Sequence, residues 1–294
     1  MSFNSLMIRL IAELRPELAS APRVLEFGNQ TFRPRPGDLD MARGALRGRG
    51  QLFEEEQLQA IERRAGAELE GSTADYYRAL GFAEYRAVDV NERYGSLVMD
   101  LNQDVSAAYG FSEAFDLVTN NGTGEHIFNQ HAVFLNSHNL CGPGGVMLHC
   151  LPFFNWLNHG FYNFNPLLFV DLAAANEYEL LRLSVASNRG AEIGAGPLGG
   201  SMEIIDIDEL QARCAVGRDT ASGPLGRLLK PKQKKRTNRP LSRALHRIMR
   251  HGPHVSVVAI LRKTAQAPFR PPIQGMYGEA NISSPELRSA YTRP

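Results

Sequence analysis

The feature that most constrains the fold of this chain is a series of short apolar runs, each with a polar residue or a glycine at or near its C-terminal end. Patterns typical of helices separate most of these runs. This alternation is typical of a doubly wound, mostly parallel sheet, in which ligands bind outside the carboxyl ends of the strands. The runs that set the pattern span residues 23–28, 85–90, 97–100, 115–120 and 145–151.

The first run ends at a glycine. Val24, Leu25 and Phe27 predict a short buried strand, and Gly28 follows it directly. Because glycine has no side chain, it lets the backbone approach a ligand closely. The sequence therefore predicts a ligand-binding turn at Gly28.

Two further apolar runs, residues 178–186 and 254–261, complete a seven-stranded α/β sheet. The second strand begins more than fifty residues after the first, whereas a parallel crossover needs about a dozen residues. We therefore expect an N-terminal helical segment 1–22, a sheet domain 23–264 with helical insertions at about 31–71 and 189–253, and a proline-rich tail 265–294.

Charge is distributed unevenly along the chain. The net charge is +1, yet residues 220–278 contain thirteen Lys and Arg and no Asp or Glu. A basic run at 230–236 predicts a positive surface that could gather an anionic small-molecule acceptor. The run lacks interleaved aromatic residues, so we do not expect nucleic acid as the partner.

Several features point to the cytoplasm. The apolar stretch 6–14 is interrupted by Arg9 and Glu13, and no later run reaches the ~20 apolar residues of a membrane span. No C-x-x-C pair occurs, which predicts free thiols in a reducing compartment for Cys141, Cys150 and Cys214. No cluster of His, Cys and carboxylate residues has metal-ligand spacing, so we expect no metal site.

The motifs resemble a known family. Glu26-Phe27-Gly28, Asp89 and Asp100-Leu101 resemble motifs of the class I S-adenosylmethionine-dependent methyltransferases. The segments 121–129 and 159–166 are similar to a bacterial group that acts on sugars and other small molecules. The resemblance implies a Rossmann-like methyltransferase fold with an antiparallel last strand. One departure is Gln30, which stands where most members carry a second glycine.

The resemblance also implies a cofactor site for S-adenosylmethionine. Asp89 and the adjacent Val90 would meet the ribose, where a carboxylate can accept two hydrogen bonds. Glu26 would face the positive end of the cofactor, and Asp100 would accept a hydrogen bond from the adenine. The remaining expected cofactor-binding residues are Phe27, Gly28, Gln30, Leu101, Asn120, Asn121 and Gly122.

The acceptor side is expected after the fourth and fifth strands. His126 and His159 are equal candidates for a general base, with Glu125 and Tyr162 as further catalytic candidates. An aromatic segment, 153–164, is expected to form a lid, and the expected substrate-binding residues in it are Phe154, Trp156 and Asn163.

Several functions remain open at this stage. The first is methyl transfer to an oxygen or nitrogen of a sugar or specialised metabolite. The alternatives are non-methyl chemistry with the same cofactor, RNA methylation, and a catalytically inactive binding protein. Fold and cofactor motifs do not identify the acceptor.

Overall fold

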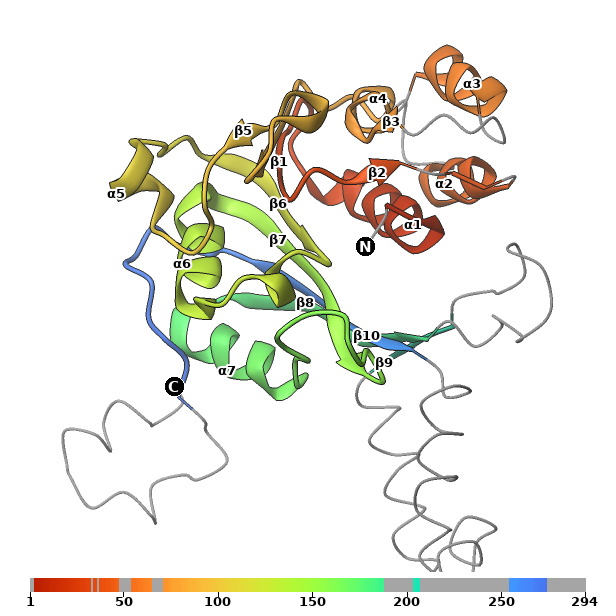
Figure 1. Cartoon of the computed structure of the whole chain (residues 1–294). Coiled ribbons are helices and arrows are strands. Elements are labelled where there is room, and N and C mark those ends of the chain that lie inside the picture. Colours follow the sequence, from red (N-terminus) through yellow and green to blue (C-terminus); the bar gives the residue numbers. More distant parts are fainter. Residues whose placement is uncertain are drawn as a thin grey trace, which may run out of the picture.

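A central eight-stranded sheet organises the protein (Figure 1). The computed structural model describes residues 3–32, 34–35, 37–47, 54–64, 71–187, 203–206 and 254–273. The strand order is β5-β4-β1-β6-β7-β10-β8-β9. These strands are β1 (Arg23–Phe27), β4 (Glu84–Asp89), β5 (Leu97–Val98), β6 (Phe115–Asn121), β7 (Cys141–Phe154), β8 (Glu179–Ser187), β9 (Glu203–Asp206) and β10 (Val255–Arg262).

The strand directions confirm the predicted fold class. The strands β5, β4, β1, β6 and β7 pair in parallel with their neighbours. The last strand, β10, is antiparallel to both β7 and β8, so β8 runs in the same direction as β7. This is the doubly wound, Rossmann-like fold with an antiparallel last strand that the sequence predicts. All seven expected strands are present, and β9 adds an eighth by pairing with β8 from within the predicted insertion 189–253.

Helices cover both faces of the sheet (Figure 1). Along β1, Val24 packs in one apolar cluster with α1 (Ser5–Leu14), α2 (Asp38–Leu46), α3 (Glu55–Arg64) and α4 (Ala74–Ala79). Leu25 and Phe27 pack in a second cluster with α6 (Gln130–Leu140), α7 (Leu167–Asn176) and α5 (Val105–Tyr109). Successive strand residues point to opposite faces, which accounts for this division.

The sequence accounts for both the burial and the ends of helix α1. Its apolar residues, Leu6, Leu10 and Leu14 among them, are buried in the cluster that also contains Val24 of β1. The side chain of Asn4 accepts hydrogen bonds from the amides of Leu6 and Met7, which are otherwise unpaired at a helix start. A 3₁₀ turn, η1 (Arg15–Glu17), contains Pro16 and ends the helix.

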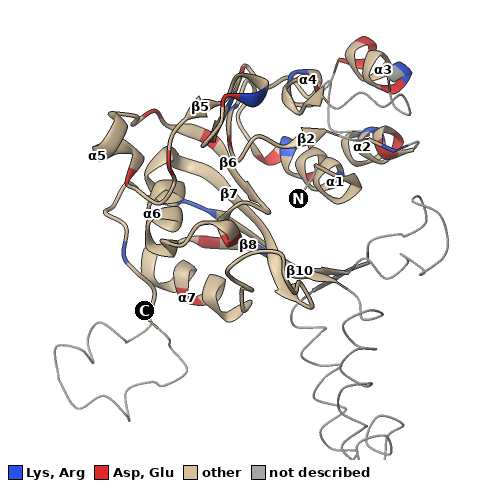
Figure 2. Cartoon of the chain, in the orientation of Figure 1, with Lys and Arg blue, Asp and Glu red and all other residues tan. Residues whose placement is uncertain are grey.

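The predicted insertion 31–71 is bracketed by a small antiparallel pair, β2 (Thr31–Phe32) and β3 (Gly71–Ser72). Between the two strands, α2 and α3 are joined by ion pairs from Arg43 to Glu55 and Glu62. Figure 2 shows charged residues of both signs on these two helices. The basic run 230–236 lies outside the described residues, so the expected positive surface stays a prediction.

Other expectations are met only in part. Cys141 and Cys150 are buried free thiols, and Cys214 lies outside the described residues. The start of the predicted tail packs on α6, where the ring of Phe269 lies beside His131 and His138. In the described part of the chain, no helix is both long and apolar enough to cross a membrane.

Candidate functional site

A cavity of about 340 Å³ opens beyond the carboxyl ends of β1, β4 and β6. Its position is the one expected for ligands in a doubly wound sheet. It brings together eight of the residues that the sequence predicts. The lining residues are Gly28, Asn29, Gln30, Val88, Asp89, Val90, Met99, Asp100, Leu101, Asn102, Gly122, Thr123, His126 and Ile127.

The turn after β1 requires a glycine. Gly28 has a φ of +77°, and its amide donates a hydrogen bond to the carbonyl of Val88 at 2.8 Å. A Cβ at Gly28 would collide with Oγ1 of Thr123, whose hydroxyl donates to the carbonyl of Phe27 at 2.7 Å. Thr123 therefore closes the turn against β1. Nothing local to Thr123 in the sequence indicates this contact.

Gln30 closes the same turn on its other side. Its Nε2 donates to the carbonyl of Asn121 at 2.9 Å, and its Oε1 accepts from Nδ2 of Asn121 at 3.3 Å. The side chain of Gln30 is almost fully buried between the turn and the end of β6. The departure from a second glycine thus has a structural consequence: a side chain fixes the turn.

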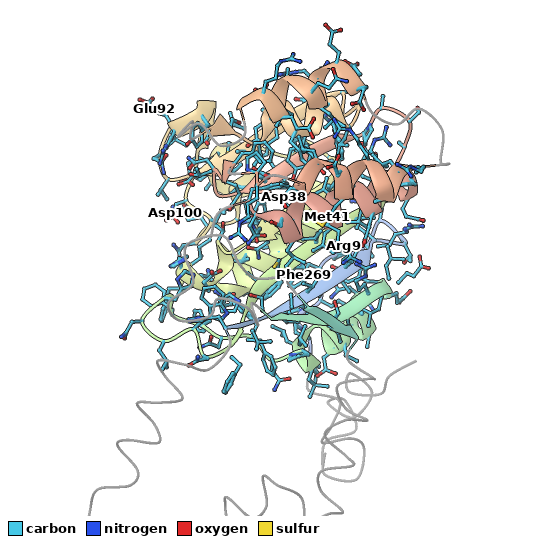
Figure 3. All side chains as sticks on the ribbon, turned by 90° about the vertical axis from the view of Figure 1, so that its right-hand side faces the viewer. Arg9, Asp38, Met41, Glu92, Asp100 and Phe269 are labelled. Carbon is cyan, nitrogen blue, oxygen red and sulfur yellow. The ribbon has the colours of Figure 1, made fainter. Side chains whose placement is uncertain are left out.

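Two carboxylates lie at the cavity wall as predicted. Oδ2 of Asp89 accepts from the backbone amide of Asn29 at 2.9 Å, and Oδ1 accepts from Nδ2 of Asn91 at 2.7 Å. Each oxygen retains a lone pair for a further donor. Oδ1 of Asp100 accepts from the backbone and side-chain nitrogens of Asn102, and these hydrogen bonds hold the pKa of Asp100 below its usual value. Figure 3 shows Asp100 at the periphery of the molecule, on the same side as Glu92.

Glu26 does not line the cavity. Its buried carboxylate accepts hydrogen bonds from the hydroxyls of Thr73 at 2.7 Å, Tyr77 at 3.0 Å and Tyr85 at 2.9 Å. Burial raises the pKa of Glu26 to about 7, although the hydroxyls act in the opposite direction. The expected contact with the positive end of a cofactor stays a prediction. Its neighbour Phe27 is buried in the core and contributes its carbonyl to the turn.

The end of β6 is a tight polar turn. Oδ1 of Asn120 accepts from the amide of Gly124 at 2.9 Å, and Nδ2 of Asn120 lies 3.3 Å from Nδ1 of His149. Burial lowers the pKa of His149 to about 3, so this imidazole is neutral. Asn120 and Asn121 are both buried behind the cavity wall. They shape the turn that carries Gly122 and Thr123.

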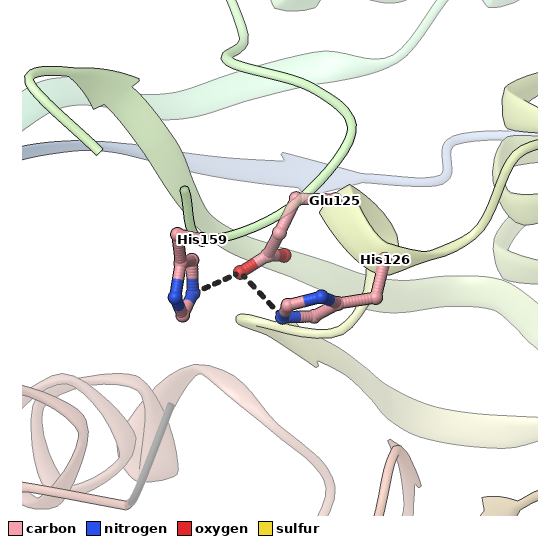
Figure 4. A group of neighbouring side chains, drawn as sticks. All are labelled: Glu125, His126 and His159. Carbon is pink, nitrogen blue, oxygen red and sulfur yellow. Dashed lines mark hydrogen bonds and ion pairs between the residues drawn. The ribbon is translucent and has the colours of Figure 1, made fainter. Parts of the chain in front are cut away.

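A cluster of three ionisable side chains lies beside the cavity (Figure 4). Glu125 lies in the 3₁₀ turn η3 (Gly124–His126) and is fully buried. Its Oε1 is 3.2 Å from Nε2 of His159 and 3.8 Å from Nε2 of His126. Burial raises the pKa of Glu125 to about 7 and lowers the pKa of both imidazoles. The two rival candidates for the base thus converge on one carboxylate.

Backbone and ring contacts hold the segment after β7 against this cluster. The amide of Phe161 donates to the carbonyl of Glu125 at 2.7 Å. A Cβ at Gly160 would lie 2.7 Å from Cγ of Glu125, so only glycine allows this approach. The ring of Trp156 lies 4.9 Å from that of His159, and its Nε1 donates to the carbonyl of Val255 at 3.0 Å.

The other predicted acceptor residues lie further out. The hydroxyl of Tyr162 donates to the carbonyl of Phe128 at 2.9 Å, so in this structure it anchors the segment. Asn163 and Phe154 are exposed, as are the rings of Phe128 and Phe161, which meet edge to face. No local pattern in the sequence distinguishes five further residues of the cavity lining, which were not predicted as site residues: Asn29, Val88, Met99, Asn102 and Ile127.

No family model matches the chain, and no curated protein matches it. Solved structures do match, among them the O-methyltransferase of a polyketide synthase multienzyme of Brevibacillus brevis with S-adenosyl-L-homocysteine (11% identity, 87% of this chain and 71% of that one, TM-score 0.38). Another is a coclaurine N-methyltransferase with N-methylheliamine and S-adenosyl-L-homocysteine (9% identity, 88% of this chain and 70% of that one, TM-score 0.39).

A methyltransferase from Thiobacillus denitrificans with S-adenosyl-L-homocysteine also matches (13% identity, 87% of this chain and 90% of that one, TM-score 0.33). The chain spans only 36% of the length of a further match, the trans-methyltransferase CalH (15% identity, 50% of this chain, TM-score 0.29). All four TM-scores lie below 0.5. The assignment of this chain to a doubly wound, Rossmann-like fold therefore rests on its own strand order and directions.

Proposed function

We propose that the protein binds S-adenosylmethionine and transfers its methyl group to an oxygen or nitrogen of a small-molecule acceptor. The observation that carries this proposal is the cavity at the ends of β1, β4 and β6, where Asp89, Asp100 and the Gly28 turn lie together. Its volume of about 340 Å³ falls in the usual range of small-molecule sites, about 300–1,000 Å³. Two solved structures that match the chain are methyltransferases with bound S-adenosyl-L-homocysteine.

The wall of the cavity suits a nucleoside. The free lone pairs of Asp89 can accept from two ribose hydroxyls, a charge-assisted arrangement that neutral side chains cannot match. Asp100 can accept from an exocyclic amine, and the neighbouring Met99, Leu101 and Ile127 supply apolar surface for a flat ring. The tight turn at Gly28 lets backbone amides approach the remainder of the ligand.

One of the lining residues is a candidate catalytic group. His126 lines the cavity and belongs to the cluster with Glu125 and His159. Methyl transfer from a sulfonium is an in-line displacement, so holding acceptor and donor in line can lower the barrier by roughly 7–11 kcal/mol. A group that removes a proton from the acceptor would add about 10²–10⁴ in rate.

The acceptor is proposed to be a sugar or specialised metabolite. The exposed rings of Phe128 and Phe161 offer an apolar rim beside the cluster, and the basic run 230–236 could attract an anionic group. The alternatives of non-methyl chemistry and RNA methylation would use the same cofactor cavity. A catalytically inactive binding protein would lack cofactor affinity or turnover.

Calorimetry with S-adenosylmethionine and S-adenosyl-L-homocysteine tests the proposal directly. We expect both ligands to bind, and Asp89→Ala to weaken binding by one or two kcal/mol, about 5- to 30-fold, because charge-assisted hydrogen bonds are lost. Asp40→Ala is the matched control, since this carboxylate is exposed on α2 and does not line the cavity. Absence of binding to the wild type would refute the proposed function, and unchanged affinity in Asp89→Ala would remove this residue from the site.

A further inference from the structure

The carboxylate of Glu125 is buried but poorly satisfied. Among the described residues, its Oε1 has one side-chain partner within hydrogen-bond distance, Nε2 of His159 at 3.2 Å, while Nε2 of His126 at 3.8 Å is too distant to be one. Its Oε2 is buried and has no hydrogen-bond partner among the described residues. A buried carboxylate usually accepts several hydrogen bonds or lies against a cation, because its desolvation is otherwise costly.

The two imidazoles approach the same oxygen from different segments. His126 follows β6 and His159 follows β7, yet both present Nε2 to Oε1 of Glu125 (Figure 4). The three candidate ligand atoms all lie within 4.8 Å of one another. Two imidazole nitrogens and one carboxylate are a ligand set that divalent zinc and iron use in catalytic sites.

We propose that Glu125, His126 and His159 bind a divalent transition-metal ion, with Zn²⁺ as the representative case. Metal–ligand bonds of about 2.0–2.1 Å in tetrahedral geometry place neighbouring ligand atoms roughly 3.4 Å apart. The distance of 3.2 Å to His159 already fits this value. The distance of 3.8 Å to His126 closes with a small side-chain rotation, which is open to this side chain because it is 46% exposed.

The backbone holds two of the ligands in place without the ion. The hydrogen bond from the amide of Phe161 to the carbonyl of Glu125 and the close approach of Gly160 fix the segment that carries His159. Trp156 packs against the ring of His159. Such outer contacts set the orientation of metal ligands and are part of a working site.

The site also has a role in the reaction, and this part rests on the proposed function. His126 lines the cofactor cavity, so three protein ligands would leave a coordination position near the acceptor. An acceptor hydroxyl bound there would lose its proton more readily. The sequence predicts no metal site, because no cluster of His, Cys and carboxylate residues in it has metal-ligand spacing; Glu125 and His126 are adjacent, whereas His159 is distant in sequence.

The test measures metal uptake by the untagged, full-length protein after treatment with a chelator and dialysis. We expect one equivalent of Co²⁺ to bind with visible absorption bands, and Zn²⁺ to displace it. Glu125→Gln and His159→Ala should each weaken binding of Zn²⁺ at least tenfold. His131→Ala, an exposed imidazole on α6, should bind like the wild type.

Two outcomes would overturn the inference. One is a wild type that takes up no Co²⁺ or Zn²⁺, which does not depend on whether the variants fold. The other is folded Glu125→Gln and His159→Ala variants that bind Zn²⁺ like the wild type. Calorimetry with S-adenosylmethionine in the presence of the chelator separates the two proposals. If the protein binds the cofactor but takes up no metal, only the metal site is refuted. If it takes up metal but does not bind the cofactor, only the proposed function is refuted.

Discussion

Glu26→Gln is the substitution whose effect can be worked out most fully from the structure. The carboxylate of Glu26 is buried beneath the turn after β1 and accepts from three hydroxyls, those of Thr73, Tyr77 and Tyr85. These donors favour the ionised form, but burial disfavours it more strongly, and the pKa rises to about 7. In the unfolded chain the same carboxyl has its ordinary pKa of 4.5.

The sign of the effect on stability follows from this difference. The native state holds the proton of Glu26 more tightly than the unfolded state does. The contribution of Glu26 to stability is therefore fully present below pH 4.5 and is lost as the pH rises through about 7. At roughly 1.4 kcal/mol for each pH unit, the loss is about 3 kcal/mol by pH 8, an order-of-magnitude value.

Guanidinium unfolding of wild type and variant at a series of pH values between 4.5 and 8 measures this effect. Glutamine does not titrate, so the free energy of unfolding of Glu26→Gln should fall less over this interval, by about 3 kcal/mol. Asp40→Asn, an exposed carboxylate on α2, should keep the pH dependence of the wild type. An identical pH dependence in wild type and Glu26→Gln would refute the reasoning. The same variant tests the expected contact of Glu26 with the cofactor, because unchanged affinity for S-adenosylmethionine would exclude it.

Three further predictions use cofactor binding and kinetics. Gly28→Ala should lower the free energy of unfolding by about 1–3 kcal/mol and weaken binding of S-adenosylmethionine, because the positive φ and the nearby hydroxyl leave no room for a methyl group; unchanged unfolding and affinity would contradict this. Tyr162→Phe should lower turnover with little change in cofactor affinity, because the anchor to Phe128 is lost; steady-state kinetics that match the wild type would exclude the role. Neutralising Lys232, Lys234 and Lys235 of the basic run together should raise the Michaelis constant of an anionic acceptor at low salt and leave cofactor affinity unchanged. Kinetics like those of the wild type would mark the run as a solvated loop.

The sheet could be predicted from the sequence because its signal is local. Each apolar run of residues 23–28, 85–90 and 115–120 forms a strand whose last residue or next turn reaches the cavity. The alternation of strands and helices then limits the topology to a few possibilities. The eighth strand, β9, was missed because Glu203–Asp206 lies in a segment whose composition resembles a loop.

The side-chain contacts of the site could not be predicted in the same way. Glu26 illustrates the reason: its acidic residue type and its position two residues before Gly28 suggest a ligand contact, yet Tyr77 and Tyr85 reach its carboxylate from 51 and 59 residues further along the chain. Gln30 is a second case, because its role depends on both the carbonyl and the amide of Asn121. Such contacts depend on which rotamers fit between elements, and a single sequence does not encode them locally.

The cluster of Glu125, His126 and His159 could be predicted from the sequence only in part. Because β6 and β7 pair in parallel, with Asn121 opposite Cys150, both strands run toward the same edge of the sheet. The segments that follow them must leave near one another, so an encounter between residues 125 and 159 follows from topology alone. What topology does not fix is that both imidazoles present Nε2 to one buried carboxylate oxygen. That convergence depends on the glycine at 160, which brings the backbone of the second segment against Glu125. Replacement of Gly160 by alanine should therefore disturb the cluster from a position that carries no ionisable group, and loss of Zn²⁺ uptake in that variant would tie the chemistry of the site to the backbone that builds it.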